Sequence, residues 1–229
     1  MKRLGVALAL FMCCVQDAGA SDNPYLAEVR SLPSVYLKGG CRNPGHNTGP
    51  TEIEASKTRL TSRYSWAIPT QEAIDEIAAF SGGTVVDFGA GSGYWAKLLS
   101  TAGVDVVAFD DWSWGKPDPL WFPVMEGNEA NLAGTSSRTL MMVWPPKNMM
   151  PLYAFLAWGG DRLVYVGELF RGNGVPLFFE EIGKWRLVRK IEIPQWWNRN
   201  DAVYLLERDT TGNWMPRTVA EAGCVEIPE

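Results

Sequence analysis

A glycine-rich segment preceded by an acidic residue is the part of the sequence whose residue types and spacing point most directly to chemistry. It reads Asp87-Phe88-Gly89-Ala90-Gly91-Ser92-Gly93. Alternating glycines allow a ligand to approach the backbone closely, and the amide N–H groups of such a loop are free to face it. Two further acids, Asp110 and Asp111, follow about 20 residues later, where nucleotide-binding folds place a carboxylate on a ribose diol. The pattern predicts a pocket for a nucleotide-like ligand.

Two other glycine loops do not fit this spacing. The dinucleotide fingerprint G-x-G-x-x-G requires a third glycine where Tyr94 stands, and a phosphate-binding loop must end in Gly-Lys-Ser/Thr, which the segment lacks. A nicotinamide-dependent dehydrogenase is therefore a disfavoured alternative, which nicotinamide binding would revive. A metal site is not expected, because the chain has 1 histidine, His46, to which Cys41 and Cys224 add too few ligands.

The elements that would position the glycine loop form a βαβ unit. Apolar patterning predicts strands over residues 84–88 and 104–109, with a helix from Tyr94 to Gly103 between them. The other predicted strands are 120–124, 139–143, 162–166, 185–193 and 202–207, and the other predicted helices are 71–80, with Thr70 as its N-cap, 150–158 and 178–182. A short link joins the last two strands into an antiparallel hairpin, so the prediction is a three-layer α/β domain with a mostly parallel sheet.

The spacing Asp-x-Gly-x-Gly-x-Gly resembles motif I of the class I S-adenosylmethionine-dependent methyltransferases. The resemblance covers about residues 64–208 and is greatest to one branch of that superfamily. The shared motifs are Tyr64-Ser65-Trp66-Ala67-Ile68-Pro69, Gly89-Ala90-Gly91-Ser92-Gly93-Tyr94-Trp95-Ala96, Trp144-Pro145-Pro146 and Tyr165-Val166-Gly167-Glu168. The resemblance implies a Rossmann-like methyltransferase fold with seven strands, or six. It also implies S-adenosylmethionine as cofactor and methyl transfer to a small molecule or peptide that it does not identify.

The same resemblance implies which residues bind the cofactor. We expect Asp87 at the amino-acid end of S-adenosylmethionine, the glycines beside its methionyl moiety and Asp110 at its ribose hydroxyls. The full predicted set is Asp87, Gly89, Ala90, Gly91, Gly93, Tyr94, Asp110 and Asp111. Glu126 is a further candidate for adenine or ribose, although an acidic loop residue is usually only solvated.

The predicted catalytic residues are Trp144, Pro145 and Glu168. The resemblance places Trp144 at the strand end that faces the transferred methyl group, in a position where amine-methylating enzymes often have Asp or Asn. Amino-group methylation is therefore not implied. The two prolines have no N–H donor, so we expect a rigid turn whose carbonyls face the cleft. Glu168 ends the fifth strand and would act as acid, base or substrate-orienting group, with a surface or N-cap role as the alternative.

Tryptophan is over-represented, with 11 residues in the chain, roughly three to four times average usage. Several follow strand ends, so they would converge on the ligand side of the sheet. An aromatic-walled cleft could stack on adenine or a flat substrate, or stabilise a sulfonium. The alternative is a packed aromatic core. The predicted substrate contacts are Trp66, Trp112, Trp144 and Trp196.

Composition and length limit the remaining possibilities. The 229 residues fit one sizeable domain, and a formal net charge of -5 argues against a nucleic-acid partner held by a broad basic surface. We divide the chain into a signal-peptide-like segment (residues 1–20), a loop-rich N-terminal extension (21–63) and a methyltransferase-like domain (64–229). No segment of the mature chain is apolar over the length that a membrane-spanning helix needs. The sequence does not indicate an oligomeric state.

The amino terminus leaves two alternatives for localisation and function. If Met1–Ala20 is a cleaved signal, the protein is extracytoplasmic and Cys41 and Cys224 could pair; if the start is misassigned, it is cytoplasmic. Because little S-adenosylmethionine is found outside cells, the alternative function is a catalytically inactive cofactor-binding, nucleotide-binding or aromatic-cleft binding module on the same fold. Trp144 at the strand end and the broken sequence after Asp111, which predicts no crossover helix, also favour that alternative.

Overall fold

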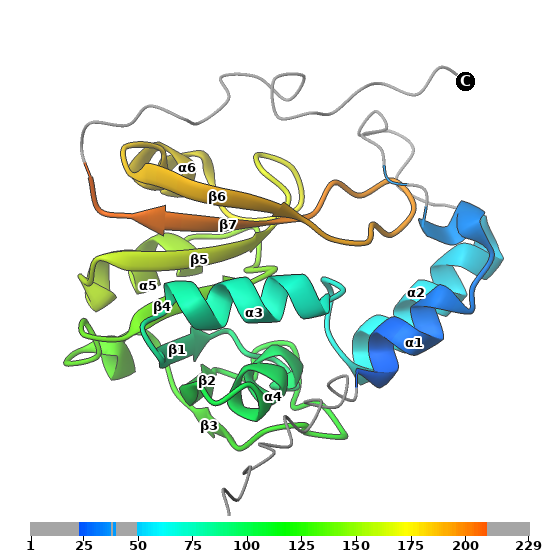
Figure 1. Ribbon diagram of the computed structural model, residues 1–229, viewed down its shortest axis with the longest axis horizontal. Coiled ribbons are helices and arrows are strands. Elements are labelled where there is room, and N and C mark those ends of the chain that lie inside the picture. Colours follow the sequence, from blue (N-terminus) through cyan, green and yellow to red (C-terminus); the bar gives the residue numbers. More distant parts are fainter. Residues whose placement is uncertain (1–22, 38, 40–49, 210–229) are drawn as a thin grey trace, which may run out of the picture.

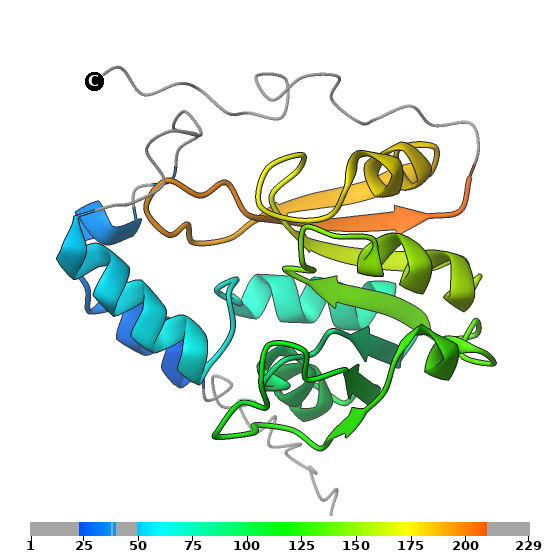
Figure 2. The same ribbon diagram turned by 180° about the vertical axis from the view of Figure 1, so that it is seen from behind.

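The computed structural model describes residues 23–37, 39 and 50–209, and Figures 1 and 2 show it from opposite sides. Its centre is a seven-stranded sheet in the order β3-β2-β1-β4-β5-β7-β6, in which β7 runs antiparallel to its neighbours β5 and β6. The strands are β1 Thr84–Phe88, β2 Asp105–Asp110, β3 Val124–Glu126, β4 Thr139–Val143, β5 Arg162–Gly167, β6 Arg186–Glu192 and β7 Ala202–Glu207. This confirms the expected three-layer Rossmann-like fold, with a mostly parallel sheet of seven strands and a C-terminal antiparallel hairpin.

Helices cover both faces of the sheet and give the fold three layers. Helices α3 and α4 lie over one face (Figure 1), and α5 and α6 lie over the other (Figure 2). The helix bounds are α1 Pro24–Arg30, α2 Thr51–Arg63, α3 Gln71–Phe80, α4 Tyr94–Thr101, α5 Met150–Trp158 and α6 Pro176–Gly183. In β1, Val85 packs in the cluster that contains α3 and α4, and Val86 packs in the cluster that contains α5 and α6. Both faces of this strand are buried, which explains its continuous apolar sequence.

Local signals predicted several helix boundaries correctly. The Thr70 hydroxyl accepts a hydrogen bond from the Ala73 N–H at 3.1 Å, as an N-cap residue does.

No helix in the described part of the chain is long and apolar enough to cross a membrane. The signal-like segment 1–20, Cys41 and His46 lie outside the described residues, as does Cys224.

The N-terminal extension differs from the expectation of a loop-rich segment. Helices α1 and α2 occupy much of it, and they lie side by side at one end of the sheet in Figures 1 and 2. Helix α1 buries Tyr25, Leu26 and Val29, whereas the longer α2 buries only a few side chains along a mostly polar sequence. Helix α1 is short and α2 is mostly polar, so neither shows a clear helical periodicity in its sequence. Packing against the domain stabilises such helices more than their own sequence does, and the sequence alone therefore did not indicate them.

The third strand also lies later than predicted. We expected it over residues 120–124, whereas β3 begins at Val124 and pairs with residues 108–110 of β2. Pro119 and Pro123 have no backbone N–H to donate, so the segment before Val124 is poorly suited to a sheet ladder.

Tyr94, at the start of α4, connects the domain to the N-terminal helices. Its hydroxyl donates a hydrogen bond to Asn23 Oδ1 at 2.8 Å and accepts one from the Tyr25 N–H at 3.2 Å. Its ring makes edge contacts with the rings of Tyr25 and Tyr64. A side chain that we expected at a cofactor is therefore used to attach α1 to α4.

The substitution Tyr94→Phe tests this structural role. It removes one buried and one partly buried hydrogen bond and should lower the free energy of unfolding by about 1–2 kcal/mol. Urea denaturation monitored by circular dichroism measures the change. Tyr153→Phe is the matched control, because Tyr153 is half-exposed on α5. A Tyr94→Phe protein as stable as the control would contradict the assignment.

Candidate functional site

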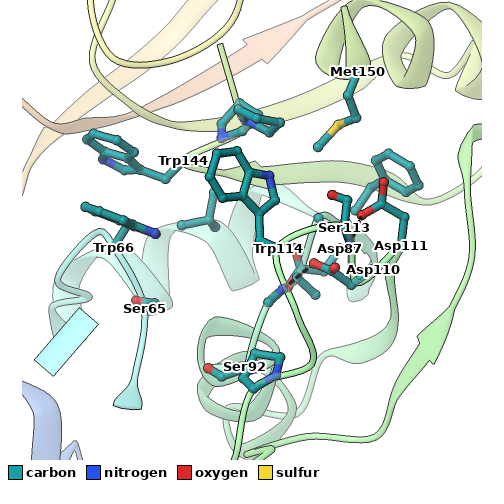
Figure 3. Close-up of a pocket in the computed structure, with 18 of the residues that line it drawn as sticks. Ser65, Trp66, Asp87, Ser92, Asp110, Asp111, Ser113, Trp114, Trp144 and Met150 are labelled. Carbon is teal, nitrogen blue, oxygen red and sulfur yellow. Dashed lines mark hydrogen bonds between the residues drawn. The ribbon is translucent and has the colours of Figure 1, made fainter. Parts of the chain in front are cut away.

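A cavity of about 690 Å³ opens at the carboxyl ends of β1, β2 and β4 (Figure 3). Strands β1 and β4 are neighbours in the sheet although β2 and β3 lie between them in sequence. The strand order therefore reverses at this point, which is where open α/β sheets bind ligands. The glycine loop lines one side of the cavity and the segment after β4 lines another. The topology brings together the two motifs that the sequence singled out.

The glycine loop presents bare backbone to the cavity. Gly91 has φ +55° and a Cβ built on it would meet nothing within 4 Å, so its Cα faces open space. Gly93 has a different role, because a Cβ there would come within 2.8 Å of the side chains of Phe122 and Val124. Gly91 allows a ligand to approach closely, whereas Gly93 allows the loop to pack on the segment that leads into β3.

The carboxylate of Asp110 joins the glycine loop to the loop that follows β2. Its Oδ2 accepts the Gly91 N–H at 2.8 Å and its Oδ1 accepts the Trp112 N–H at 2.8 Å. An ionised carboxylate has about four acceptor positions, so each oxygen keeps capacity for a further donor. Asp110 can therefore hold the two loops and still accept hydroxyl groups from a ligand.

Asp87 is the least compensated group of the site. It is 1% exposed, and its Oδ1 has no hydrogen-bond partner within the described residues. Burial, and to a smaller extent the nearby charge of Asp110, raise the pKa of its carboxyl to about 8. A buried carboxyl on a cavity wall needs either a proton or a cationic partner. The site is thus suited to a ligand that brings a positive charge to Asp87.

Two stacked indoles form the opposite wall of the cavity, which we call the Trp66–Trp144 stack. Their ring centroids are 5.0 Å apart with an interplanar angle of 16°, and Figure 3 shows them across the cavity from Asp87 and Asp110. Trp66 is half-exposed. Trp144 continues the β4–β5 ladder through its N–H, which donates to the Val166 carbonyl at 2.8 Å. This wall offers a broad apolar surface for a ligand.

Many of the predicted site residues line the cavity. They are Trp66, Asp87, Gly89, Ala90, Gly91, Asp110, Asp111, Trp144 and Pro145. Others are placed elsewhere: Gly93 and Tyr94 pack as described above, Trp112 lies beside Lys116, and Trp196 is buried with its indole N–H on the Tyr25 hydroxyl at 3.1 Å. Glu126 is also absent from the wall, where Asn128 and Glu129 stand instead.

The carbonyls of the two prolines are not free, contrary to our expectation. Pro145 O accepts the Asn173 side-chain amide at 3.2 Å. Pro146 O accepts the backbone N–H groups of Gly174 at 3.2 Å and of Asn148 at 2.9 Å. The loop after β5 supplies Asn173 and Gly174, and so the turn is fixed by hydrogen bonds that a one-dimensional pattern cannot show.

Glu168 lies behind the cavity wall. It is 1% exposed; its Oε1 accepts the Asn200 N–H at 3.0 Å, whereas its Oε2 has no hydrogen-bond partner within the described residues. Gly172 lines the cavity, and a Cβ built there would lie 2.7 Å from Glu168 Oε2 and 2.9 Å from the Trp144 ring. The absence of a side chain at Gly172 therefore leaves the free oxygen close to the cavity.

Sequence reasoning missed some residues of the wall. Trp114 is 87% exposed and lines the cavity, whereas the predicted contact from the same loop is Trp112. Thr61 and Ser62 at the end of α2 also line it, so the cavity crosses the boundary that we placed at residue 64. The pair Trp112 and Trp114 indicated that this loop belongs to the site, but not which of the two side chains lines the cavity. Nothing in the polar sequence of α2 indicated a site.

Comparisons with known proteins give only distant similarities to solved structures. No family model matches the sequence, and a search of curated proteins finds no match. The chain is similar to S-adenosylmethionine-dependent methyltransferases of known structure. Magnesium protoporphyrin IX methyltransferase from Synechocystis with bound S-adenosylmethionine shares 14% identity over 72% of this chain and 88% of that chain, with a TM-score of 0.47.

Two further solved structures show the same level of similarity. A S-adenosylmethionine-dependent methyltransferase from Aquifex aeolicus shares 17% identity over 70% of this chain and 100% of that chain, with a TM-score of 0.42. The 1,6-didemethyltoxoflavin-N1-methyltransferase of Burkholderia thailandensis shares 16% over 73% and 93%, with a TM-score of 0.46. Such distant similarity assigns neither an activity nor a substrate to this chain.

Within its described residues, no cluster of His, Cys, Asp and Glu could hold a metal ion.

The buried carboxyls predict how stability depends on pH. Burial raises the pKa of Asp87 and of Asp201 from 3.8 to about 8. Between these values the folded protein keeps protons that the unfolded chain has released, so stability falls as the pH rises through this window. Each group contributes a slope of up to about 1.4 kcal/mol per pH unit. Urea unfolding of the ligand-free protein from pH 5 to pH 8 should show the decline, and Asp87→Asn should flatten it. A slope unchanged by Asp87→Asn would refute this account of Asp87.

Proposed function

We propose that the protein binds S-adenosylmethionine in the cavity and transfers its methyl group to a small molecule or peptide. The observation that carries the proposal is the Asp87 carboxyl, which is buried on the cavity wall with an oxygen that lacks a hydrogen bond. S-adenosylmethionine carries an ammonium group and a ribose diol beside its sulfonium, and Asp87 and Asp110 at the strand ends offer acceptors for the first two. The cavity volume lies within the usual range for small-ligand sites, about 300–1,000 Å³.

Three groups of this chain would hold the cofactor. Asp87 would accept the ammonium group, directly or through water, and would be ionised once that charge is bound. Asp110 would accept the ribose hydroxyls with the acceptor positions that Gly91 and Trp112 leave free. The bare Cα of Gly91 would contact the methionyl part.

The remaining wall would bind the methyl acceptor. When bound, S-adenosylmethionine supplies an electrophilic methyl group on a good leaving group, so the protein mainly has to align the acceptor with it. The Trp66–Trp144 stack and Pro145 would orient a flat or apolar acceptor. Glu168 would take the proton from a hydroxyl or ammonium acceptor, since its free Oε2 lies beside Gly172 at the edge of the cavity.

A second candidate function is cofactor binding without methyl transfer. Trp144 favours it, because an indole stands where a polar group would hold an amine acceptor. Cofactor binding together with failure to methylate a broad acceptor panel would support this alternative. Methylation of any acceptor by the wild-type protein, lost in Glu168→Gln or Trp66→Ala, would exclude it.

Gly91→Val tests the position of the cofactor. A valine there would project into the cavity and should weaken S-adenosylhomocysteine binding by more than about tenfold in isothermal titration. Gly159→Val is the matched control for backbone strain, because Gly159 has φ +65° with nothing within 4 Å and lies outside the cavity. Normal binding by a folded Gly91→Val protein, or absence of binding by the wild-type protein, would refute the proposed site.

Proton release tests the role of Asp87. At pH 7 its carboxyl is mostly protonated in the free protein, since its pKa is about 8. A bound ammonium group should ionise it and release about one proton per site. Titrations with S-adenosylhomocysteine in two buffers of different ionisation enthalpy measure this number. Asp87→Asn should remove the release and weaken binding; equal proton release in both proteins would argue against contact between Asp87 and the ammonium group.

A further inference from the structure

Trp144 adopts a backbone conformation that its own side chain disfavours. Its φ is +52°, in the left-handed region that bulky L-residues rarely occupy. Such a conformation persists where the surrounding structure fixes it, and it is often found at functional sites. The backbone hydrogen bond to Val166 holds the main chain but leaves the direction of the indole undetermined. Another interaction must orient the ring.

Asp201 is the hydrogen-bond acceptor for this indole. The Trp144 Nε1–H donates to Asp201 Oδ1 at 2.7 Å, and Asp201 is 1% exposed. Asp201 is itself held by the side chain of Gln195, whose Oε1 accepts the Asp201 N–H at 2.5 Å and whose Nε2 donates to the Asp201 carbonyl. The β6–β7 hairpin thus presents a fixed acceptor to a residue at the end of β4.

Two further contacts limit the movement of the ring. The Arg199 guanidinium from the same hairpin lies 5.7 Å from the centroid of the Trp144 ring. A Cβ at Gly172 would come within 2.9 Å of the ring edge, so the loop after β5 closes on it. These contacts fill space around the indole, but the bond to Asp201 is the directional one, because a hydrogen bond has a preferred angle and dispersion contacts do not.

We propose that Asp201 is a positioning residue that holds Trp144 in the Trp66–Trp144 stack and so sets the shape of the cavity wall. Asp201 does not line the cavity, and it reaches a ligand only through the indole. The role of this wall in receiving the methyl acceptor rests on the proposed function. The role of Asp201 in holding the stack is independent of that function and can be measured on the ligand-free protein.

The ionisation state of Asp201 suggests a conservative variant. Burial, and then the charge of Glu168, raise the pKa of Asp201 to about 8, although the bond from Trp144 and the charge of Arg199 act in the opposite direction. Near neutral pH the carboxyl is therefore mostly uncharged, and an uncharged carbonyl oxygen accepts the indole N–H. Asparagine has the same shape and keeps such an oxygen, so Asp201→Asn should preserve the hydrogen bond, whereas Asp201→Leu removes it.

The experiment compares Asp201→Leu with Asp201→Asn in the ligand-free full chain. Stacked indoles couple their electronic transitions, so the Trp66–Trp144 stack should contribute a couplet to the circular dichroism spectrum. Trp144→Phe identifies that contribution by removing it. We expect Asp201→Leu to lose most of the couplet and to make Trp66 more accessible to acrylamide quenching, and Asp201→Asn to retain the wild-type signals.

Binding of S-adenosylhomocysteine provides a separate readout. In the proposed function the cofactor is held by Asp87, Gly91 and Asp110 and not by the Trp66–Trp144 stack, so its affinity should change far less in either variant than it does in Gly91→Val. Failure of every protein, including wild type, to bind it would refute the proposed function and leave the positioning role intact. A folded Asp201→Leu protein with an unchanged couplet would overturn the positioning role whatever the titration shows.

A second measurement covers the case in which Asp201→Leu does not fold. The Trp144 indole N–H signal in a nitrogen-15 spectrum is identified as the one missing from Trp144→Phe. We expect it to be protected from hydrogen exchange in the wild-type protein and to shift in Asp201→Asn, where the acceptor changes from carboxyl to amide. A rapidly exchanging signal that does not respond to Asp201→Asn would overturn the proposal.

Discussion

The carboxylate of Asp110 is the interaction on which the cavity depends. It ends β2 and accepts one backbone N–H from the glycine loop after β1 and another from the loop that follows β2. Because β1 and β2 are adjacent parallel strands, their loops leave the sheet at the same edge, where the Trp121 N–H also donates to the Ser92 carbonyl at 2.8 Å. The bonds to Gly91 and Trp112 fix the floor of the cavity. The same negative charge is also one reason why Asp87 retains its proton.

The N-terminal helices complete the site from the other side. The Ser92 hydroxyl donates to the Tyr64 carbonyl, and the Trp121 indole N–H donates to the Arg63 carbonyl at 2.7 Å. The end of α2 is thereby attached both to the glycine loop and to the segment before β3. Trp66 follows directly, so the position of one partner of the Trp66–Trp144 stack depends on how the extension docks. The extension therefore forms part of the cavity wall as well as packing at one end of the sheet.

The sequence predicted the features that depend on local pattern. The apolar run predicts strand β1 and the glycine spacing predicts the loop after it, and the sheet order then places Asp87, Asp110 and Trp144 around one cavity. What could not be predicted depends on partners far apart in the chain. Tyr94 follows the glycine loop, yet its hydroxyl bonds to Asn23, which is 71 residues away. Trp196, like Trp66, was predicted to line the site as one of the many tryptophans near strand ends. Its indole N–H instead bonds to Tyr25 in α1, which is 171 residues away.

Glu168 and Asp201 show why a strand end is easier to predict than the direction of its side chains. The prediction placed Glu168 correctly at the end of β5, but the loop that follows folds over it and leaves Gly172 between its carboxylate and the cavity. Asp201 carried no motif, and its importance follows from the antiparallel pairing that brings β7 beside β5. Burial and the neighbouring Glu168 disfavour the ionised form of Asp201, so this carboxyl raises the free energy of the ligand-free fold. In return the domain has an oriented indole and an unpaired oxygen next to the cavity, as is expected where a fold gives up stability for a preorganised site.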